Sequence, residues 1–281
     1  MTDKKVLTLQ DISCFGQCSI TVALPIISAC GIETAVLPSA VLSTHTGGFV
    51  GFTFRDLTED IPGIIAHWKK EGIKFDCLYT GYLGNISQVE YAKVIRRELL
   101  NDGAKLIVDP AMADNGVLYN GFDDSFVKGM RKLCAQADIM LPNLTEASLM
   151  TGIEFKEENH TEKYIDDMLT ELGKIGAKMI ILKGISFEKN KIGIVVYEAD
   201  TREKQFYFQE RMDKNSPGTG DCFASAFTGA LMRGKSEYES ATIAADFVRE
   251  CIKNTIDDES HVYGVKFEKA IPMLVNRCNG F

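Results

Sequence analysis

The chain contains no long hydrophobic run and no concentration of positive charge. Its first ten residues lack the apolar core of a signal peptide, and no later segment stays apolar over the length of a membrane span. The net charge is −8, and the basic clusters are no longer than pairs such as Lys4-Lys5, which leaves no basic face for a nucleic acid. We therefore expect a cytoplasmic protein whose partners include neither a membrane nor a nucleic acid.

Three common site patterns are also absent. No Cys-x-x-Cys pair occurs among the eight cysteines, which lie mostly within apolar patterns, so we expect reduced, buried thiols rather than disulfides or zinc ligands. No Gly-x-x-x-x-Gly-Lys-Ser/Thr string is present, which argues against a P-loop enzyme. Gly16 is the only glycine directly after the first expected strand, so the Gly-x-Gly-x-x-Gly fingerprint of a Rossmann dehydrogenase is missing as well.

The sequence shows instead a regular alternation of strand and helix patterns. A length of 281 residues with 45% hydrophobic content is enough for one sizeable core, and no repeat or low-complexity linker divides the chain. We therefore expect a single domain over residues 1–281. Short apolar strands separated by helical segments predict an α/β fold with a doubly wound, mostly parallel central sheet that is flanked by helices.

The expected elements can be placed approximately along the chain. The expected strands of the parallel sheet are 6–9, 34–37, 77–80, 106–108, 139–141 and 179–182. Segments 192–197 and 205–208 are rich in β-forming residues and are expected to form an antiparallel hairpin at the sheet edge. Ser19 is placed to cap a helix over 19–30, in which Pro25 should introduce a kink or delay the helix start. Further helices are expected at 61–68, 88–100, 122–134, from 145, 164–175, from 221, 238–252 and 267–275.

A glycine-rich turn precedes one of these helices. In Gly218-Thr219-Gly220-Asp221, preceded by Pro217, the glycines permit unusual backbone angles, and an Ala- and Phe-rich helix follows. The N-terminus of a helix presents unpaired N–H groups and positive potential, so this turn is a candidate anion site. Asp221 lies in the first helical turn, where it is either a capping carboxylate or a base beside the bound anion.

Other polar residues follow the expected strands, and the carboxyl ends of strands in a doubly wound sheet meet at one edge. Asn143 and Glu146 fall on the first turn of a helix, and oxygen ligands of this kind suit Mg²⁺. The alternative is that each merely ends a strand or begins a helix; together with the later anion site they favour a metal–nucleotide site. The residues that can converge are Asp11, His45, Tyr82, Asp109, Asn143, Glu146, Lys183 and Asp221.

The loop over residues 43–52 allows two interpretations. Its hydroxyls, histidine, glycines and aromatic residues suit a segment that covers a flat ring. It could equally be a plain surface loop with Phe49 and Phe52 packed into the core, and the local sequence slightly favours this second interpretation.

Taken together, these segments resemble the ribokinase-like small-molecule kinases. The matching elements are Asp109-Pro110, the Asn-x-x-Glu pattern at 143–146, Leu182-Lys183-Gly184 and the Gly218–Asp221 turn. Segments 43–47 and 80–84 are similar to those of the pyridoxal kinase branch, and the matches run in family order from about residue 7 to 234. The resemblance implies ATP-dependent phosphorylation of the hydroxymethyl group of pyridoxal, pyridoxine or pyridoxamine, with Mg²⁺ and possible assistance from K⁺.

The resemblance also implies roles for individual residues. Asp221 would be the catalytic base, and the N–H groups of Gly218, Thr219 and Gly220 would hold the transferred phosphoryl group. The vitamin ring would be contacted by Asp11 or Ser13, His45, Thr46 and Tyr82. The nucleotide would be bound by Asp109, Asp114, Asn143, Glu146, Lys183 and Thr219, with Mg²⁺ organised through water by Asp109, Asn143 and Glu146.

Two departures from the family pattern affect the substrate. Asp11 stands where many pyridoxal kinases have a ring-contacting Ser, although Ser13 could take that place, and no Tyr follows Thr46 nearby. A hydroxymethylpyrimidine kinase is therefore an alternative, as is a sugar kinase, although residues 31–57 leave little room for a separate β lid. A silent binding protein would not need a base such as Asp221. By analogy with the family we also expect a homodimer.

Overall fold

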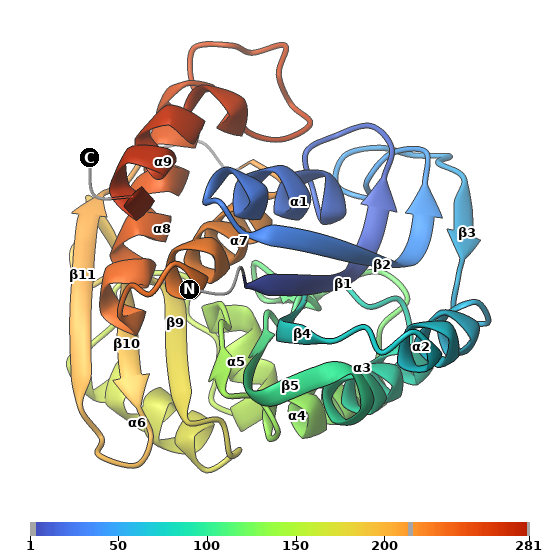
Figure 1. The fold of residues 1–281 in the computed structure, drawn as a ribbon. Helices are drawn as coiled ribbons and strands as arrows, with labels where there is room; N and C mark the ends of the chain where they lie inside the picture. Colours follow the sequence, from blue (N-terminus) through green and yellow to red (C-terminus); the bar gives the residue numbers. More distant parts are fainter. Residues whose placement is uncertain (1–3, 213–215, 280–281) are drawn as a thin grey trace.

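The computed structural model describes residues 4–212 and 216–279, and a nine-stranded sheet runs through it (Figure 1). The strand order is β11-β10-β9-β8-β5-β4-β1-β2-β3. The six strands from β9 to β2 in this order are parallel, while β3, β10 and β11 pair antiparallel with their neighbours. Their bounds are β1 Lys5–Ser13, β2 Glu33–Leu42, β3 Phe54–Asp56, β4 Phe75–Thr80, β5 Leu100–Val108, β8 Ile139–Met140, β9 Met179–Ile185, β10 Lys191–Glu198 and β11 Lys204–Glu210. The predicted α/β class with a mostly parallel sheet is confirmed.

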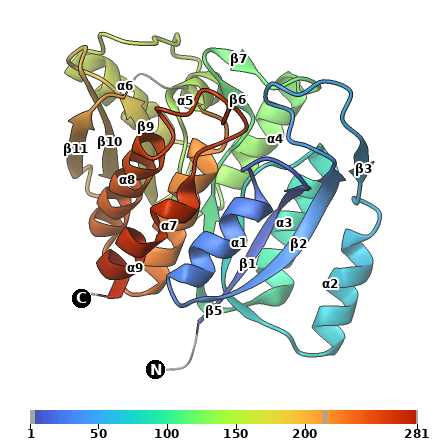
Figure 2. The same ribbon diagram turned by 90° about the horizontal axis from the view of Figure 1, so that it is seen from above.

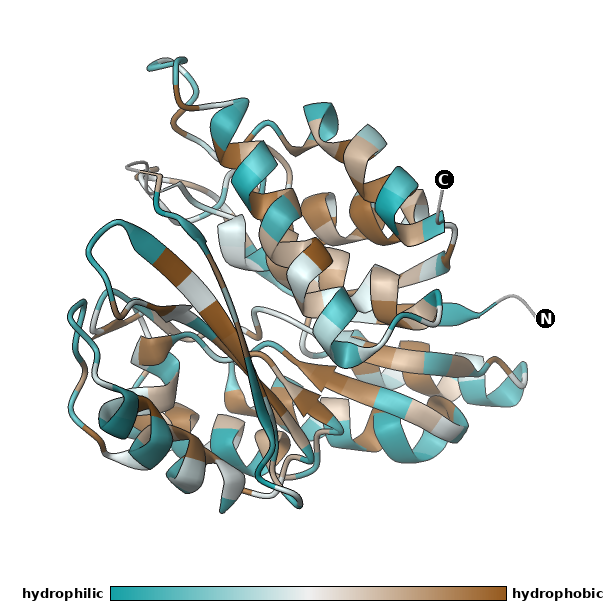
Figure 3. Ribbon diagram, turned by 90° about the vertical axis from the view of Figure 1, so that its left-hand side faces the viewer, coloured by the Kyte–Doolittle hydropathy of each residue, from teal (hydrophilic) through white to brown (hydrophobic). Residues whose placement is uncertain are grey.

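Helices cover both faces of the sheet (Figure 2). One face packs against α2 Ile61–Lys70, α3 Ile86–Leu99, α4 Asp124–Cys134, α5 Leu144–Thr151 and α6 Glu162–Gly173. The other face packs against α1 Ile20–Ala29, α7 Thr219–Met232, α8 Glu237–Lys253, the short 3₁₀ helix η1 Phe267–Lys269 and α9 Ile271–Asn279. Among the helices of the described chain, none combines the length and the apolar character needed to cross a membrane. Figure 3 shows hydrophobic residues concentrated where strands and helices meet, with hydrophilic residues on the outer helix surfaces.

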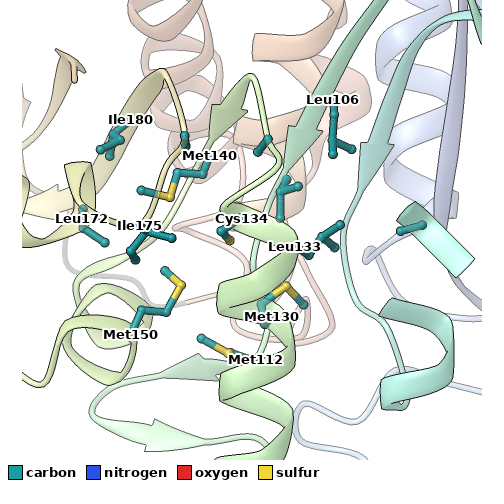
Figure 4. Packing of buried hydrophobic residues seen from close by; sticks show 14 of the residues in the cluster. Leu106, Met112, Met130, Leu133, Cys134, Met140, Met150, Leu172, Ile175 and Ile180 are labelled. Carbon is teal, nitrogen blue, oxygen red and sulfur yellow. The ribbon is translucent and has the colours of Figure 1, made fainter. Parts of the chain in front are cut away.

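The core on the α2–α6 face contains methionines from separate segments. Met112, Met130, Met140 and Met150 all belong to this cluster, together with Cys134 (Figure 4). Unbranched thioether side chains fill irregular gaps between elements that meet at different angles. This packing fixes the start of α5 and the chain after β5 relative to one another, which matters because both carry polar residues of the candidate site.

Most elements lie where the sequence placed them, with three differences. Pro25 lies inside α1, whose start at Ile20 is not delayed. Strand β3 was not predicted; it pairs with the end of β2 through Phe54 and its neighbours. The short hairpin of β6 Ala113–Asp114 and β7 Val117–Leu118 was also missed, because two-residue strands carry no periodic pattern. The predicted edge hairpin is confirmed as β10 and β11.

The order of the strands places a crevice beside β1. From β1 the chain passes to β2 on one side of it, then returns to β4 on the other side. At such a switch in direction the loops after neighbouring strands diverge and leave an opening at the carboxyl ends of the strands. The fold therefore places the loops that follow β1, β2 and β4 around one opening.

Candidate active site

A cleft of about 900 Å³ lies at the carboxyl ends of the strands. It is bordered by the loops after β1, β2 and β4, by the starts of α5 and α7, and by β9–β11 and α8. Every residue that the sequence predicted for the site lines this cleft: Asp11, Ser13, His45, Thr46, Tyr82, Asp109, Asp114, Asn143, Glu146, Lys183, Gly218, Thr219, Gly220 and Asp221. The structure thus brings together residues that are up to 210 positions apart in the chain.

The start of α7 depends on one glycine that no other residue can replace. Gly218 is the N-cap residue, with φ 77°, and a Cβ there would lie 1.9 Å from the backbone oxygen of Gln17. Gly220 is different, because a Cβ on it would meet no atom within 4 Å. The first N–H groups of a helix have no acceptor within it, so this turn presents donors to the cleft.

Asp221 is a partly buried carboxylate in the first turn of α7. Its Oδ2 accepts a hydrogen bond of 3.0 Å from the backbone N–H of Ser19. The pKa of Asp221 is raised to about 7, mainly by burial; the negative charges of Asp109 and Asp11 also raise it, while the Ser19 hydrogen bond and the charge of Lys183 lower it. At neutral pH this group therefore exchanges a proton readily, as a general base requires.

Ser19 performs a different task from the predicted one. It occupies the N-cap position of α1, but its side chain makes no capping hydrogen bond. Its backbone angles are φ 55° and ψ −131°, a region that residues other than glycine rarely adopt. This conformation directs the N–H of Ser19 to the carboxylate of Asp221. The prediction that Ser19 precedes the helix is therefore confirmed, and the prediction that its side chain caps the helix is wrong.

Two polar residues of β1 form one unit at the other side of the cleft. Asp11 and Ser13 are both buried, and the hydroxyl of Ser13 donates a hydrogen bond of 2.9 Å to Oδ2 of Asp11. Burial raises the pKa of Asp11, against the effect of its hydrogen bonds to Ser19 and Ser13. A ligand that contacts either residue therefore meets a hydrogen-bonded Asp11–Ser13 pair.

His45 is held by both of its ring nitrogens. Nδ1 accepts the N–H of Gly47 at 3.1 Å, so Nε2 carries the proton and donates it to the backbone oxygen of Tyr263 at 3.0 Å. The ring also fits closely against Gly16, where a Cβ would lie 2.2 Å from the His45 ring. His45 therefore ties three loops together at the rim of the cleft, and its nitrogens are already engaged within the protein.

The loop over residues 43–52 does not fill the core. Phe49 and Phe52 are partly buried and belong to neither core cluster of the described residues, so the expectation that they pack into the core is wrong. The ring of Phe49 packs edge-on against His45 with centroids 5.0 Å apart. Tyr82, across the cleft opening, stacks on Phe122 at 5.5 Å. These aromatic side chains border the same end of the cleft as Asp11.

A cation and three carboxylates occupy the middle of the cleft. Nζ of Lys183 lies 3.1 and 3.2 Å from the two carboxylate oxygens of Asp109. Burial lowers the pKa of Lys183, but the charges of Asp109, Glu146 and Asp221 outweigh burial and raise it. Lys183 therefore stays charged. Burial, followed by the charge of Asp109, raises the pKa of Glu146 well above its usual value.

Asn143 and Glu146 cap α5 through reciprocal hydrogen bonds. Oδ1 of Asn143 accepts the N–H of Glu146 at 2.8 Å, and Oε2 of Glu146 accepts the N–H of Asn143 at 2.8 Å. The Asn143 amide also donates to the backbone oxygen of Ala113 at 2.9 Å. Asp114 lies on β6, is exposed, and accepts the N–H of Asn115 at 2.9 Å. The helix-start alternative for Asn143 and Glu146 is therefore realised in the structure.

The donor set can be compared with what Mg²⁺ needs. Within residues 4–212 and 216–279, no three His, Cys, Asp or Glu side chains are grouped to hold a metal ion. Asn143 has both side-chain polar atoms engaged, whereas the carboxylates of Asp109 and Glu146 keep lone pairs that are free of the hydrogen bonds described above. Two buried carboxylates, one of them paired with Lys183, fit a hydrated Mg²⁺ held through water and phosphate oxygens, and do not form a cage of protein ligands.

The sequence did not reveal the far end of the cleft. This end is lined by apolar and basic side chains of β10, α7 and α8 and of the residue after β11: Ile194, Arg211, Phe223, Val248, Arg249 and Ile252. In the sequence the apolar members follow the same strand and helix periods as core residues, and no local signal separates the two. Only the packing of α8 across β10 shows which of them face the opening.

Comparisons with known proteins agree with this geometry. The family model described as phosphomethylpyrimidine kinase matches residues 66–266. Hydroxymethylpyrimidine/phosphomethylpyrimidine kinase of Bacillus subtilis is 27% identical over 252 residues, which cover 89% of this chain and 83% of that protein.

Two solved structures extend the likeness to the fold. A Bacteroides thetaiotaomicron protein assigned as a phosphomethylpyrimidine kinase, in a crystal form with pyridoxal, is 34% identical with a TM-score of 0.90, covering 97% of this chain and 96% of that one. Pyridoxal kinase of Lactobacillus plantarum is 28% identical with a TM-score of 0.88 and the same coverage of 97% and 96%. The chain therefore belongs to the phosphomethylpyrimidine kinase family and is a kinase of the pyridoxal or hydroxymethylpyrimidine type.

Proposed function

We propose that this chain transfers the γ-phosphoryl group of ATP to the hydroxymethyl group of pyridoxal, pyridoxine or pyridoxamine. The observation that carries the proposal is the carboxylate of Asp221, with a pKa of about 7, in the first turn of a helix whose glycine-rich start opens into the cleft. The resemblance of residues 43–47 and 80–84 to pyridoxal kinases supports a B6 vitamer as substrate, as does the related protein whose crystal form contains pyridoxal.

Asp221 is the general base in this proposal. Because Oδ2 is held by the N–H of Ser19, Oδ1 is the oxygen left to accept the proton of the substrate hydroxyl. The hydroxyl oxygen forms a bond to the γ-phosphorus, the bond from that phosphorus to the bridging oxygen breaks, and ADP leaves with that oxygen. The N–H groups of Gly218, Thr219 and Gly220 stabilise the negative charge on the transferred group.

The other polar residues position the two substrates. Asp109 and Glu146 would hold Mg²⁺ through water, with Asn143 fixing the orientation of Glu146, and the ion would reduce the charge of the ATP phosphates. Lys183 keeps a positive charge beside the same phosphates. Asp114 and Thr219 contribute at the rim, where both line the cleft.

The ring is held at the opposite end, between aromatic and polar walls. Tyr82, stacked on Phe122, offers a flat surface, while the Asp11–Ser13 pair and Thr46 supply hydrogen-bonding groups. His45 fixes the shape of the rim through Gly47 and Tyr263.

A second candidate substrate is hydroxymethylpyrimidine. It is favoured by the family model over 66–266 and by the Bacillus subtilis relative. Asp11 also suits it, because a buried carboxylate accepts hydrogen bonds and an aminopyrimidine donates them. Both substrates present a hydroxymethyl group to the same base, so the reaction is the same in the two cases.

The test is ADP release with Mg-ATP and pyridoxal, pyridoxine, pyridoxamine, hydroxymethylpyrimidine or ribose, measured on the wild type and on Asp221→Asn. Turnover of a B6 vitamer that falls by about 10²–10⁴ in the variant is the expected result. Turnover of the pyrimidine alone would replace the substrate and keep the base. Absence of turnover on the whole panel, with ATP still bound, would refute the proposed function in favour of a binding protein.

Two further expectations from the sequence stay predictions. Assistance by K⁺ would appear as a higher rate in KCl than in a tetramethylammonium salt at equal ionic strength. The expected homodimer would show twice the mass of 31.1 kDa in light scattering after size-exclusion chromatography.

A further inference from the structure

Three lysine and arginine side chains line the cleft, and they differ in their ion pairs. Lys183 forms an ion pair with Asp109, and a terminal nitrogen of Arg249 lies 3.6 Å from a carboxylate oxygen of Glu210. Arg211 forms no ion pair with any residue in 4–212 or 216–279. Among the lysines and arginines of the described cleft lining, Arg211 is therefore the one that forms no ion pair with an acidic side chain.

Arg211 is also incompletely hydrogen-bonded. It directly follows β11, where its backbone N–H donates to the oxygen of Asn190 at 2.8 Å. Its side chain is partly buried, and Nε is fully buried without a hydrogen-bond partner among the described residues. A buried donor of this kind is costly to leave unpaired, and a guanidinium is the donor best matched to a phosphate oxygen.

The surroundings indicate which part of a nucleotide would meet this residue. Ile194, Val248 and Ile252 line the same cleft and are apolar, which suits the base of a nucleotide and leaves its phosphates to the basic lining residues. The cleft as a whole is acidic, so a polyphosphate needs cations that are not already neutralised. Its acidic lining residues are Asp11, Asp109, Asp114, Glu146, Glu157, Glu210 and Asp221.

We infer that Arg211 binds the polyphosphate of the nucleotide and makes the cleft select nucleotides that carry a β-phosphate. The inference rests on the proposed function, because it assumes that the far end of the cleft holds the phosphoryl donor. Arg211 then donates its terminal N–H groups to phosphate oxygens.

The test compares ATP, ADP, AMP and adenosine by titration calorimetry with MgCl₂ present. The proteins are the wild type, Arg211→Met, Arg211→Gln and Arg211→Lys. Arg55→Met is the matched control, since Arg55 is an exposed arginine on the edge strand β3 and does not line the cleft. We expect Arg211→Met and Arg211→Gln to weaken ADP and ATP binding by about 10–100-fold and to leave adenosine binding unchanged. Arg211→Lys should recover part of the loss, because it keeps the charge without the fork of donors.

Steady-state kinetics supply the second measurement. The KM for ATP should rise in Arg211→Met, while the KM for the second substrate stays within about twofold of wild type. Because the substitution removes an unpaired buried donor, the Tm of the variant should be no lower than that of the wild type. An equal loss of ADP and adenosine binding, or no loss of either, would overturn the inference while the kinase function stands. A wild type that binds none of the four nucleotides would overturn the proposed function itself.

Discussion

Gly220 offers a substitution that the protein should tolerate and the reaction should not. A Cβ at this position would meet no atom within 4 Å, the residue is exposed, and it lies in the cleft at the start of α7. Alanine is a better helix former than glycine, by up to about 1 kcal/mol. For a chain of this size such a gain raises Tm by roughly 2 °C. Gly220→Ala should therefore fold at least as stably as the wild type.

The effect on catalysis has the opposite sign. In the proposed reaction the backbone N–H groups around Gly220 approach the transferred phosphoryl group to a distance of about 2.9 Å. A methyl group in the open space beside them displaces that group, and a misplacement of about 1 Å costs on the order of 10²-fold in rate. We expect kcat/KM to fall by about that factor, measured as ADP release with the vitamer that the wild type turns over.

Gly63 provides the matched control. It lies in the first turn of α2, is exposed, and would also meet no atom within 4 Å of an added Cβ. Gly63→Ala should raise Tm by a similar amount and leave kcat/KM unchanged. Wild-type kcat/KM in Gly220→Ala would refute the assignment of this turn as the phosphoryl site. A fall of Tm in Gly220→Ala alone would show that the space is needed by the fold.

Four other substitutions or conditions give distinct outcomes. Asp221 has a raised pKa and must be deprotonated to act, so kcat/KM should fall about tenfold per pH unit below about pH 7 and level off above it; a profile flat from pH 5 to 8 would contradict this. Asp221→Asn should also have a higher Tm than the wild type above pH 7, because the penalty of a desolvated charge, which develops as pH rises from the unfolded to the folded pKa, is removed. Ser19→Gly should raise unfolding free energy by about 1 kcal/mol through relief of the positive φ, and an unchanged or lower value would show that the hydroxyl compensates for the strain. Gly16→Ala should lower Tm by several degrees through its clash with His45, with thermal denaturation as the assay; a wild-type Tm would mean that His45 moves freely.

The order of the elements follows from local chemistry. Apolar runs such as 77–80 and 106–108 are short and bounded by polar segments, which favours strands that are buried on both faces. Their alternation with helical periods leaves the parallel, doubly wound sheet as the consistent solution, and β4 and β5 occupy those positions. By contrast, β3 and the β6–β7 hairpin exist because the end of β2 and the chain after β5 offer them partners, which no local pattern can show.

Some site residues could be recognised from the sequence because their environment is built by their own neighbours. Gly218 and Asp221 belong to one turn and one helix start, and the positive φ and the outward N–H groups come from that segment alone. The capping pair of Asn143 and Glu146 is likewise a local structure, three residues apart. Whether these groups serve only the helix or also a ligand is a separate matter that spacing cannot decide.

The sequence by itself thus predicted the alternation of strands and helices, the glycine-rich turn at 218–220 and the carboxylate of Asp221 beside it, since each can be read from a few neighbouring residues. Only the tertiary structure decided the electrostatic environment of that carboxylate. The pKa of Asp221 depends on burial and on Asp11 and Asp109, which lie more than 100 residues away in the chain. The pairing of Lys183 with Asp109 and the unpaired state of Arg211 within the described residues arise in the same way. Charge and desolvation act through space, so they become readable only when distant strands have been brought to one edge of the sheet.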